Sequence, residues 1–138
     1  MKTLWMSVII IIPLIAGCEK AKNDNPDLPQ GTYTGTFQRI IPSEDAIVSN
    51  VMISFSEGKW SGQGDIPKYP ALCNGSVALQ GNKLVFINDC AWTADFDWSL
   101  ILSGEYNYEM NGDSLIISKD YNPASEYRDI YRLCLTKS

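Results

Sequence analysis

Apolar and polar residues alternate along most of the chain from Gly31 onward, and turn-forming residues interrupt the alternation about every 8–12 residues. A period of two is typical of β-strands with one buried face, and no segment of useful length shows the helical period. The first such segment covers residues 33–40 and the last covers 127–135. The pattern predicts one all-β domain at 31–138, an antiparallel up-and-down meander of eight or nine strands. Pairing of the last strand with the first would close it into a small barrel and remove the edges.

Short turns predict how neighbouring strands pair. A two-residue turn at Glu57-Gly58 would place Phe55 opposite Trp60, which makes an apolar cross-strand pair. The strongest turn signal is Asn111-Gly112, between segments 105–110 and 113–118. This turn would place Tyr108 opposite Leu115. Alternation in 96–102 predicts one more half-buried strand before it.

A third turn predicts a disulfide. If Gly81-Asn82 form the whole loop, the register brings Cys73 opposite Cys90 on the core face, at a non-hydrogen-bonded pair. Such pairs have Cα atoms about 4.5 Å apart, at the short end of the disulfide range. Closing a loop of about 16 residues in this way stabilises a fold by roughly 3 kcal/mol. Cys134 then lacks a partner, and we expect a buried free thiol, because the spacing of the three cysteines is poor for a metal site.

The N-terminal segment has the pattern of an export signal. Lys2 precedes an apolar stretch over 4–15, which is too short to span a bilayer, and small residues precede Cys18. The run Leu14-Ile15-Ala16-Gly17-Cys18 resembles the lipobox of bacterial lipoproteins, in which the cysteine receives acyl chains, palmitate among them, and becomes the first mature residue. The resemblance implies removal of the signal peptide 1–17. Residues 18–30 are polar and contain two prolines, so we expect a flexible tether.

The start of the predicted β domain shows a second resemblance. The run Gly-Thr-Tyr-Thr-Gly-Thr-Phe at 31–37, followed by a meander of this size, resembles lipocalin-like lipoproteins of Gram-negative bacteria. The resemblance implies a lipocalin-like barrel in the bacterial cell envelope, attached to a membrane by the lipid on Cys18. The outer membrane is the expected location, with the domain facing the periplasm or the cell surface.

Composition narrows the possible chemistry. The chain has no His, which removes Ser-His-Asp and Cys-His nucleophiles and His-ligated zinc. Lys and Arg number 11 against 16 Asp and Glu, so a net charge of −5 argues against nucleic-acid binding. Asp95 and Asp97 are spaced to share one strand face, a pattern that suits acid–base chemistry or calcium. Their alternation with Phe96 and Trp98 favours two carboxylates that face water. We expect no enzyme activity, no cofactor and no metal.

Aromatic residues are the best candidates for binding. An eight-stranded barrel is just wide enough to be filled by its side chains or to hold one small ligand. Large inward rings favour filling, whereas Gly35, Gly62 and Gly104 would leave space. Two of the aromatics, Trp92 and Tyr69, are expected on loops at one rim. The candidate ligand-binding residues are Trp60, Trp92, Trp98, Phe55, Phe86 and Tyr69.

Two functions are compatible with these features. In the first, a non-enzymatic envelope lipoprotein binds a small apolar or amphipathic ligand inside its barrel. In the second, the barrel is filled, and the protein is an accessory module that binds an envelope protein or glycan through rim loops such as 66–72 and 121–125.

Overall fold

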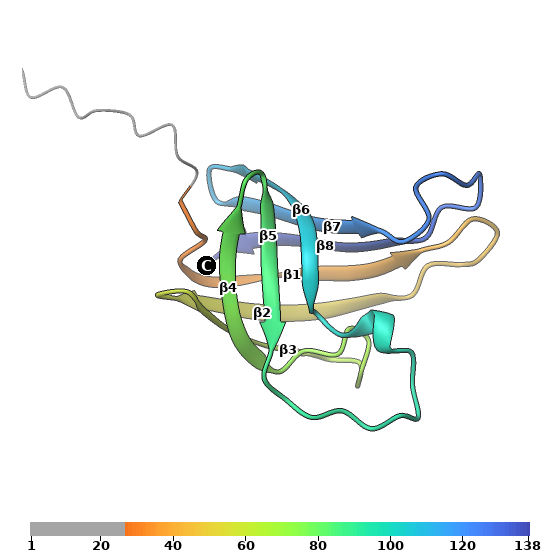
Figure 1. Cartoon of the computed structure of the whole chain (residues 1–138), viewed down its shortest axis with the longest axis horizontal. Coiled ribbons are helices and arrows are strands. Elements are labelled where there is room, and N and C mark those ends of the chain that lie inside the picture. The colour runs from red at the N-terminus through yellow and green to blue at the C-terminus, as the bar shows by residue number, and fades with distance from the viewer. Residues whose placement is uncertain (1–26) are drawn as a thin grey trace, which may run out of the picture.

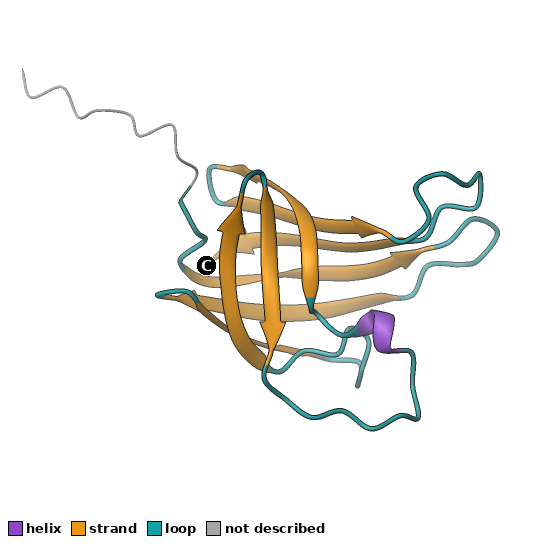
Figure 2. Ribbon diagram, viewed as in Figure 1, coloured by secondary structure: helices purple, strands orange, loops and turns teal. Residues whose placement is uncertain are grey.

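The computed structural model describes residues 27–138, which form a closed barrel of eight consecutive antiparallel strands (Figure 1). The strands are β1 (Gly31–Ile40), β2 (Val48–Ser56), β3 (Lys59–Gly64), β4 (Asn74–Gln80), β5 (Lys83–Asn88), β6 (Gly104–Asn111), β7 (Ser114–Asp120) and β8 (Ile130–Lys137). A single 3₁₀ turn, η1 (Trp98–Leu100), interrupts the connection between β5 and β6 (Figure 2). Within this part of the chain no helix is long and apolar enough to cross a membrane. The predicted all-β meander is confirmed, with eight strands, and β1 pairs with β8 to close it.

The connections differ sharply between the two ends of the barrel. Two-residue turns join β2 to β3, β4 to β5 and β6 to β7 at one end, which we call the turn end. The four longer connections, 41–47, 65–73, 89–103 and 121–129, lie at the opposite end, which we call the loop end (Figure 1). The C-terminus lies at the turn end, where Ser138 N donates to Thr32 O at 2.8 Å. Long loops are therefore available on one side of the barrel only.

Two of the predicted turns are confirmed. Glu57 and Gly58 have φ of 49° and 75°, as a type I′ turn requires, and Phe55 pairs with Trp60. The β4–β5 register also follows from a two-residue loop at 81–82.

The turn predicted at Asn111-Gly112 is shifted by one residue. Asn111 pairs with Ser114, so the loop is Gly112-Asp113 and Tyr108 lies opposite Ile117 rather than Leu115. Gly112 carries a positive φ of 59° and Asp113 does not, which matches the type II′ turn, where glycine takes the first central position. Asn111 therefore stays in the strand. Moving the turn by one residue moves each cross-strand partner by two positions along β7. Side chains alternate between faces with a period of two, so each residue stays on its predicted face.

The strand predicted for 96–102 is wrong. This segment is a loop that contains η1, and only Ile101 forms an isolated bridge, to Ala71. The side chain of Asp97 accepts a hydrogen bond from Ser99 N at 2.9 Å and caps the turn. A capping Asp competes with extended structure by bonding to the backbone two residues ahead.

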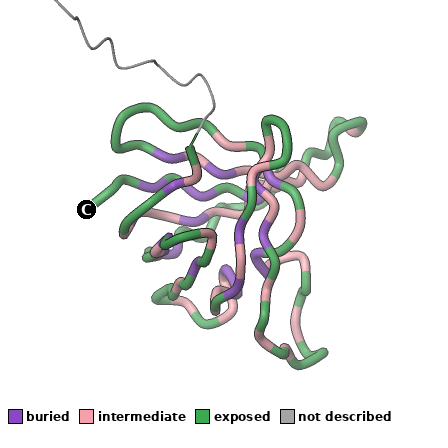
Figure 3. The backbone as a smooth tube through the Cα atoms, turned by 60° about the vertical axis from the view of Figure 1, so that its left-hand side comes forward, coloured by how far each residue is buried: buried purple, intermediate pink, exposed green. Residues whose placement is uncertain are grey.

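The barrel interior is filled by side chains. Every strand contributes at least one buried inward residue (Figure 3), and the aromatic rings among these residues pack against one another in turn along the interior. Ring centroids are separated by 6.3 Å from Phe55 to Phe86, 5.6 Å from Phe86 to Tyr106, 5.3 Å from Tyr106 to Tyr131 and 4.6 Å from Tyr131 to Phe37. The buried core consists of Tyr33, Phe37, Val51, Ile53, Phe55, Trp60, Val77, Leu84, Phe86, Leu102, Tyr106, Leu115, Ile117, Tyr131, Leu133 and Leu135.

The glycines expected to leave space inside do not do so. A Cβ built on Gly35 would lie 1.9 Å from Cys134 O, because the backbone of β8 crosses β1 closely at this point. A Cβ built on Gly62 would lie 3.2 Å from Cγ1 of Ile53, and a Cβ built on Gly104 would lie 3.2 Å from Nζ of Lys119. Neighbouring groups already use the volume that the missing side chains release.

Two buried tyrosines give a matched test of this packing. The fully buried Tyr131 hydroxyl has no hydrogen-bond partner among the described residues, whereas Tyr106 donates to Ile101 O and accepts from Ser103 N, each at 3.3 Å. An unpaired buried hydroxyl costs about 1–3 kcal/mol, and a satisfied one contributes about 1 kcal/mol. Tyr131→Phe should therefore raise the free energy of unfolding by about 1 kcal/mol, and Tyr106→Phe should lower it by about as much. Urea denaturation measures both, and equal losses would contradict the assignment of Tyr131.

The predicted disulfide is present. Cys73 and Cys90 are bonded, with Cα atoms 6.3 Å apart rather than near 4.5 Å. The difference arises because the β4–β5 ladder ends at Gly75 and Asn88, so the cysteines lie beyond the last strand pair, half-buried at the loop end. Cys134 is a free thiol but is exposed, not buried as predicted. It alternates with the inward-facing Leu133 and Leu135, which places it on the outer face.

Packing begins before the first strand. Pro29 is fully buried, Leu28 packs against the core, and Gln30 accepts a hydrogen bond from Glu57 N at 3.3 Å. The packed domain thus includes residues 28–30, which the sequence had assigned to the tether 18–30. The predicted signal peptide 1–17 and Cys18 lie outside the described residues.

Candidate functional site at the loop end

The six candidate aromatic residues fall into two groups. Trp60, Phe55 and Phe86 belong to the filled interior, where each is at most 2 % exposed. Trp60 Nε1 donates to Ile87 O at 3.2 Å, so its polar atom is also satisfied. These three side chains build the barrel and are closed to a ligand in this conformation.

The other three lie at the loop end. Tyr69 is half-buried, packs on Phe37 with centroids 5.0 Å apart, and accepts a hydrogen bond from Arg39 N at 3.1 Å. Trp92 is half-buried and Trp98 is 58 % exposed. The expectation that Trp92 and Tyr69 lie on loops at one rim is confirmed.

The loop end of the barrel interior is closed by an arginine that was not among the residues predicted from the sequence. Arg39, whose side chain is 9 % exposed, forms a bidentate ion pair with Asp129, in which Nη2 and Oδ2 are 2.8 Å apart. Its Nη1 donates to Ser99 Oγ at 2.9 Å, and its Cζ lies 4.6 Å from the centre of the Tyr121 ring. The hydrogen bond with Asp129 raises the pKa of Arg39 above its usual value, so the guanidinium stays charged.

This arginine joins three parts of the loop end. Arg39 ends the inward series of β1, Asp129 precedes β8, and Ser99 lies in η1. Tyr121 adds a hydrogen bond from its hydroxyl to Ser99 O at 2.8 Å. The contacts hold η1 across the mouth of the barrel. The sequence did contain a signal for this role. Arg39 occupies the next inward position after Tyr33, Gly35 and Phe37, and a charged residue on the inward face of a strand needs a partner.

An open pocket of about 540 Å³ lies beside this closed mouth. Its volume is within the range of sites for small molecules, about 300–1,000 Å³. It forms where the β5–β6 loop, residues 89–103, leaves the end of β5. The residues that line it are Asn88, Cys90, Ala91, Trp92, Trp98, Ile101 and Ser103, none of which is charged.

Local contacts hold the pocket walls in place. Trp98 Nε1 donates to Thr93 O at 2.9 Å, which orients an indole that is otherwise largely exposed. Trp92 packs edge-on against Phe96 with centroids 5.7 Å apart. Cys90 is bonded to Cys73, and Asn88 Nδ2 donates to Cys90 O at 3.0 Å. A site whose side chains are fixed before binding loses less entropy when a ligand arrives.

Trp92 carries an unused hydrogen-bond donor. Its Nε1 is shielded from solvent and has no acceptor among the described residues. Buried indole N–H groups usually find a partner. In contrast, the indoles of Trp60 and Trp98 are both bonded to backbone carbonyls.

The carboxylates singled out from the sequence have separate structural roles. Asp95 bonds to Thr93 and forms an ion pair with Lys68, whose Nζ lies 3.3 Å away. Asp97 caps η1. The hydrogen bond from Thr93 lowers the pKa of Asp95, and those from Ser99 lower the pKa of Asp97. Both therefore stay ionised at neutral pH, and they do not share a strand face as the sequence suggested.

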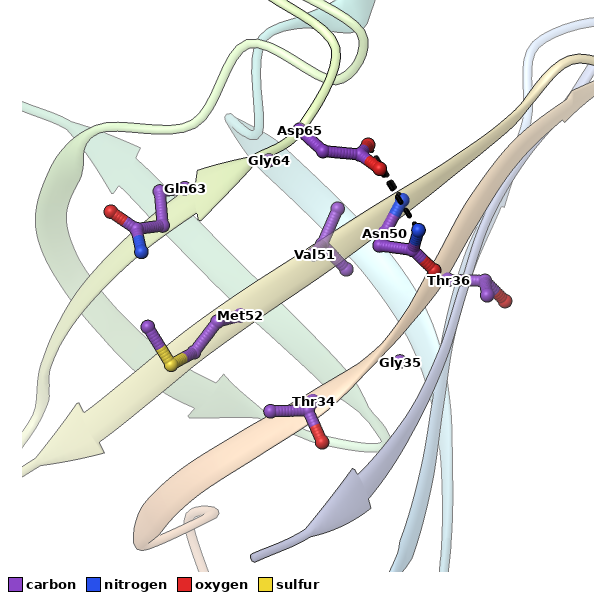
Figure 4. A pocket seen from close by; sticks show the side chains of 9 residues that line it. All are labelled: Thr34, Gly35, Thr36, Asn50, Val51, Met52, Gln63, Gly64 and Asp65. Atoms are coloured by element: carbon purple, nitrogen blue, oxygen red, sulfur yellow. Dashed lines mark hydrogen bonds between the residues drawn. The ribbon is translucent and has the colours of Figure 1, made fainter.

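A second depression, of about 590 Å³, lies on the outer face of β1, β2 and β3 (Figure 4). Its floor passes over Val51, which is flanked by Gly35 and Gly64 on the neighbouring strands. The Asp65 carboxylate at its edge already accepts three hydrogen bonds of 2.8–2.9 Å, from Ser49 Oγ and from Asn50 N and Nδ2. Its most polar group is thus already used within the fold, which makes this depression the weaker candidate.

Comparisons with known protein families, with curated proteins and with solved structures find no match to the chain.

Proposed function

We propose that this protein is a non-enzymatic lipoprotein of the bacterial cell envelope that binds an envelope partner, a protein or a glycan, through the loop end of its barrel. The observation that carries the proposal is the contrast between the interior and the rim. The interior is filled by touching aromatic rings and its mouth is closed by Arg39, whereas Trp92 and Trp98 line an open pocket on the same end. This contrast favours binding at the rim over binding inside the barrel.

The arrangement of the barrel ends supports a tethered module. The described chain enters at the turn end through Leu28 and Pro29, and a lipid on Cys18 would hold that end toward the membrane. Two or three acyl chains give lasting anchorage, because each buried CH₂ contributes about 0.8 kcal/mol. The loop end would then point away from the membrane toward its partner. We place the protein at the outer membrane, facing the periplasm or the surface.

Anchoring and partner binding are separable in one experiment. Full-length chains are expressed in a Gram-negative host, cells are fractionated, and proteins or glycans crosslinked to the chain are recovered. Cys18→Ser should move the chain from the membrane to the soluble fraction. Trp98→Ala should leave it at the membrane but reduce the crosslinked partner at least about tenfold, which corresponds to 1.4 kcal/mol of binding free energy.

Met110→Ala is the matched control, because Met110 is also an exposed apolar residue, 41 % accessible, but lies near the turn end. It should change neither location nor crosslinking. If Trp98→Ala keeps full crosslinking, the loop-end assignment is wrong. If Cys18→Ser stays in the membrane fraction, the lipid anchor is wrong.

A further inference from the structure

The aromatic rings around the loop end repeatedly lie against cationic groups. The Arg39 guanidinium lies 4.6 Å from the centre of the Tyr121 ring, and Lys119 Nζ lies 5.1 Å from the same ring. Lys68 Nζ lies 4.9 Å from the centre of the Phe96 ring, in the β5–β6 loop itself. Trp98 is the most exposed ring of that loop, and tryptophan gives the strongest cation–π contacts, yet no cation of the described chain lies over it.

The β5–β6 loop, residues 89–103, contains Asp89, Asp95 and Asp97 and no Lys or Arg. Asp95 is paired with Lys68 from the β3–β4 loop. Asp89 lies between the pocket residues Asn88 and Cys90, is exposed, and forms no ion pair with any described residue. Asp97 directly precedes Trp98. A positive ligand would be attracted to this loop and an anion repelled.

The lining itself suits an organic cation rather than a metal ion. Its residues are apolar, aromatic or neutral polar, so they offer no set of charged oxygen ligands to a hard metal ion. Alkylammonium groups combine a positive charge with an apolar surface, which matches indole faces inside a negative rim.

We propose that the pocket between Trp92 and Trp98 binds an alkylammonium group, presented either by a small quaternary ammonium compound or by a lysine side chain of a partner. The proposal rests on the loop end being the binding surface, and it specifies the chemistry recognised there. Trp98 supplies an exposed indole face, and Asp89 supplies an unpaired charge at the rim. The fixed orientation of Trp98, through Thr93 O, presents the face before the ligand arrives.

The test follows the indole N–H signals of the ¹⁵N-labelled full chain in a non-ionic detergent, each signal assigned by a Trp→Phe variant. Choline is the probe, and its neutral carbon analogue 3,3-dimethylbutan-1-ol is the control of equal shape. Choline should shift the Trp92 and Trp98 signals saturably and leave the Trp60 signal in place. The neutral analogue should bind about fivefold more weakly or worse. Added salt should weaken choline binding by screening.

Two variants separate the charge from the ring. Trp98→Leu keeps an apolar side chain but removes the indole face, and it should weaken choline at least about fivefold. Asp89→Asn keeps the size of the rim residue but removes its charge, and it should weaken choline to a smaller extent. Met110→Leu, on an exposed residue near the turn end, should change nothing.

The outcomes discriminate between sources and between proposals. If Nα-acetyl-lysine N-methylamide, which keeps a free ε-ammonium, shifts the signals and choline does not, the site recognises a lysine side chain. If choline and its neutral analogue bind equally, or if no cation shifts the signals, the alkylammonium inference is overturned. The proposed function survives that result when Trp98→Ala still loses the crosslinked partner, and it fails together with the inference when crosslinking is unaffected.

Discussion

Replacing Phe86 by alanine is expected to lower the free energy of unfolding by about 3–5 kcal/mol. Phe86 is 1 % exposed and lies at the centre of the aromatic interior, with ring centroids of Trp60 and Tyr106 at 5.8 and 5.6 Å. Truncation removes buried apolar surface and leaves a cavity between rings that β-strands on all sides hold apart. Urea denaturation of the variant, analysed with a shared m-value, measures the loss.

The neighbouring residue provides the control. Ile87 lies on the same strand but faces outward and is 57 % exposed, and its carbonyl, which accepts from Trp60 Nε1, remains after substitution. Ile87→Ala should change the free energy of unfolding by less than about 0.5 kcal/mol. If Phe86→Ala costs less than about 1.5 kcal/mol, the barrel interior is not tightly filled, and binding inside it regains support.

Removing the disulfide is expected to cost about 3 kcal/mol. Cys73 and Cys90 are 17 residues apart, and their bond ties the start of β4 to the β5–β6 loop beyond the end of the strand ladder. Without it the unfolded chain regains the entropy of an open loop. The double variant Cys73→Ala with Cys90→Ala should show this loss in urea denaturation. It should also weaken choline binding, because Cys90 lines the pocket.

Cys134→Ala is the control for thiol chemistry. Cys134 is exposed and unpaired, so its removal should leave stability unchanged and prevent disulfide exchange during unfolding. Equal unfolding midpoints for the double variant and the unaltered chain would contradict the expected contribution of the disulfide to stability.

The strand order and most registers could be predicted because alternation and turn residues are local signals. Phe55 opposite Trp60 followed from Glu57-Gly58 alone, and the Cys73–Cys90 bond followed from Gly81-Asn82. At 111–113 two turns were locally plausible, and the identity of the residue with positive φ decided between them.

The loop end was less predictable because long-range contacts shape it. The alternation in 96–102 is real, but the cap from Asp97 and the bond from Arg39 to Ser99 override it. The sequence separated Trp92 and Tyr69, expected on rim loops, from the other aromatic residues. It did not separate the core residue Phe86 from Trp98, which was assigned to a strand and lies on the rim. Composition has no means of showing which rings face each other inside a closed barrel.

The pairing of β1 with β8 also constrains how this chain reaches its native state. These strands lie at opposite ends of the described sequence, and Tyr33 pairs with Lys137. Contacts between distant segments form slowly because a large loop must close first. Until β8 has been synthesised, β1 and β7 each have an unpaired edge that can join another chain. β8 is therefore the strand that closes both edges, and truncation within it should expose β1 and β7 together and favour aggregation.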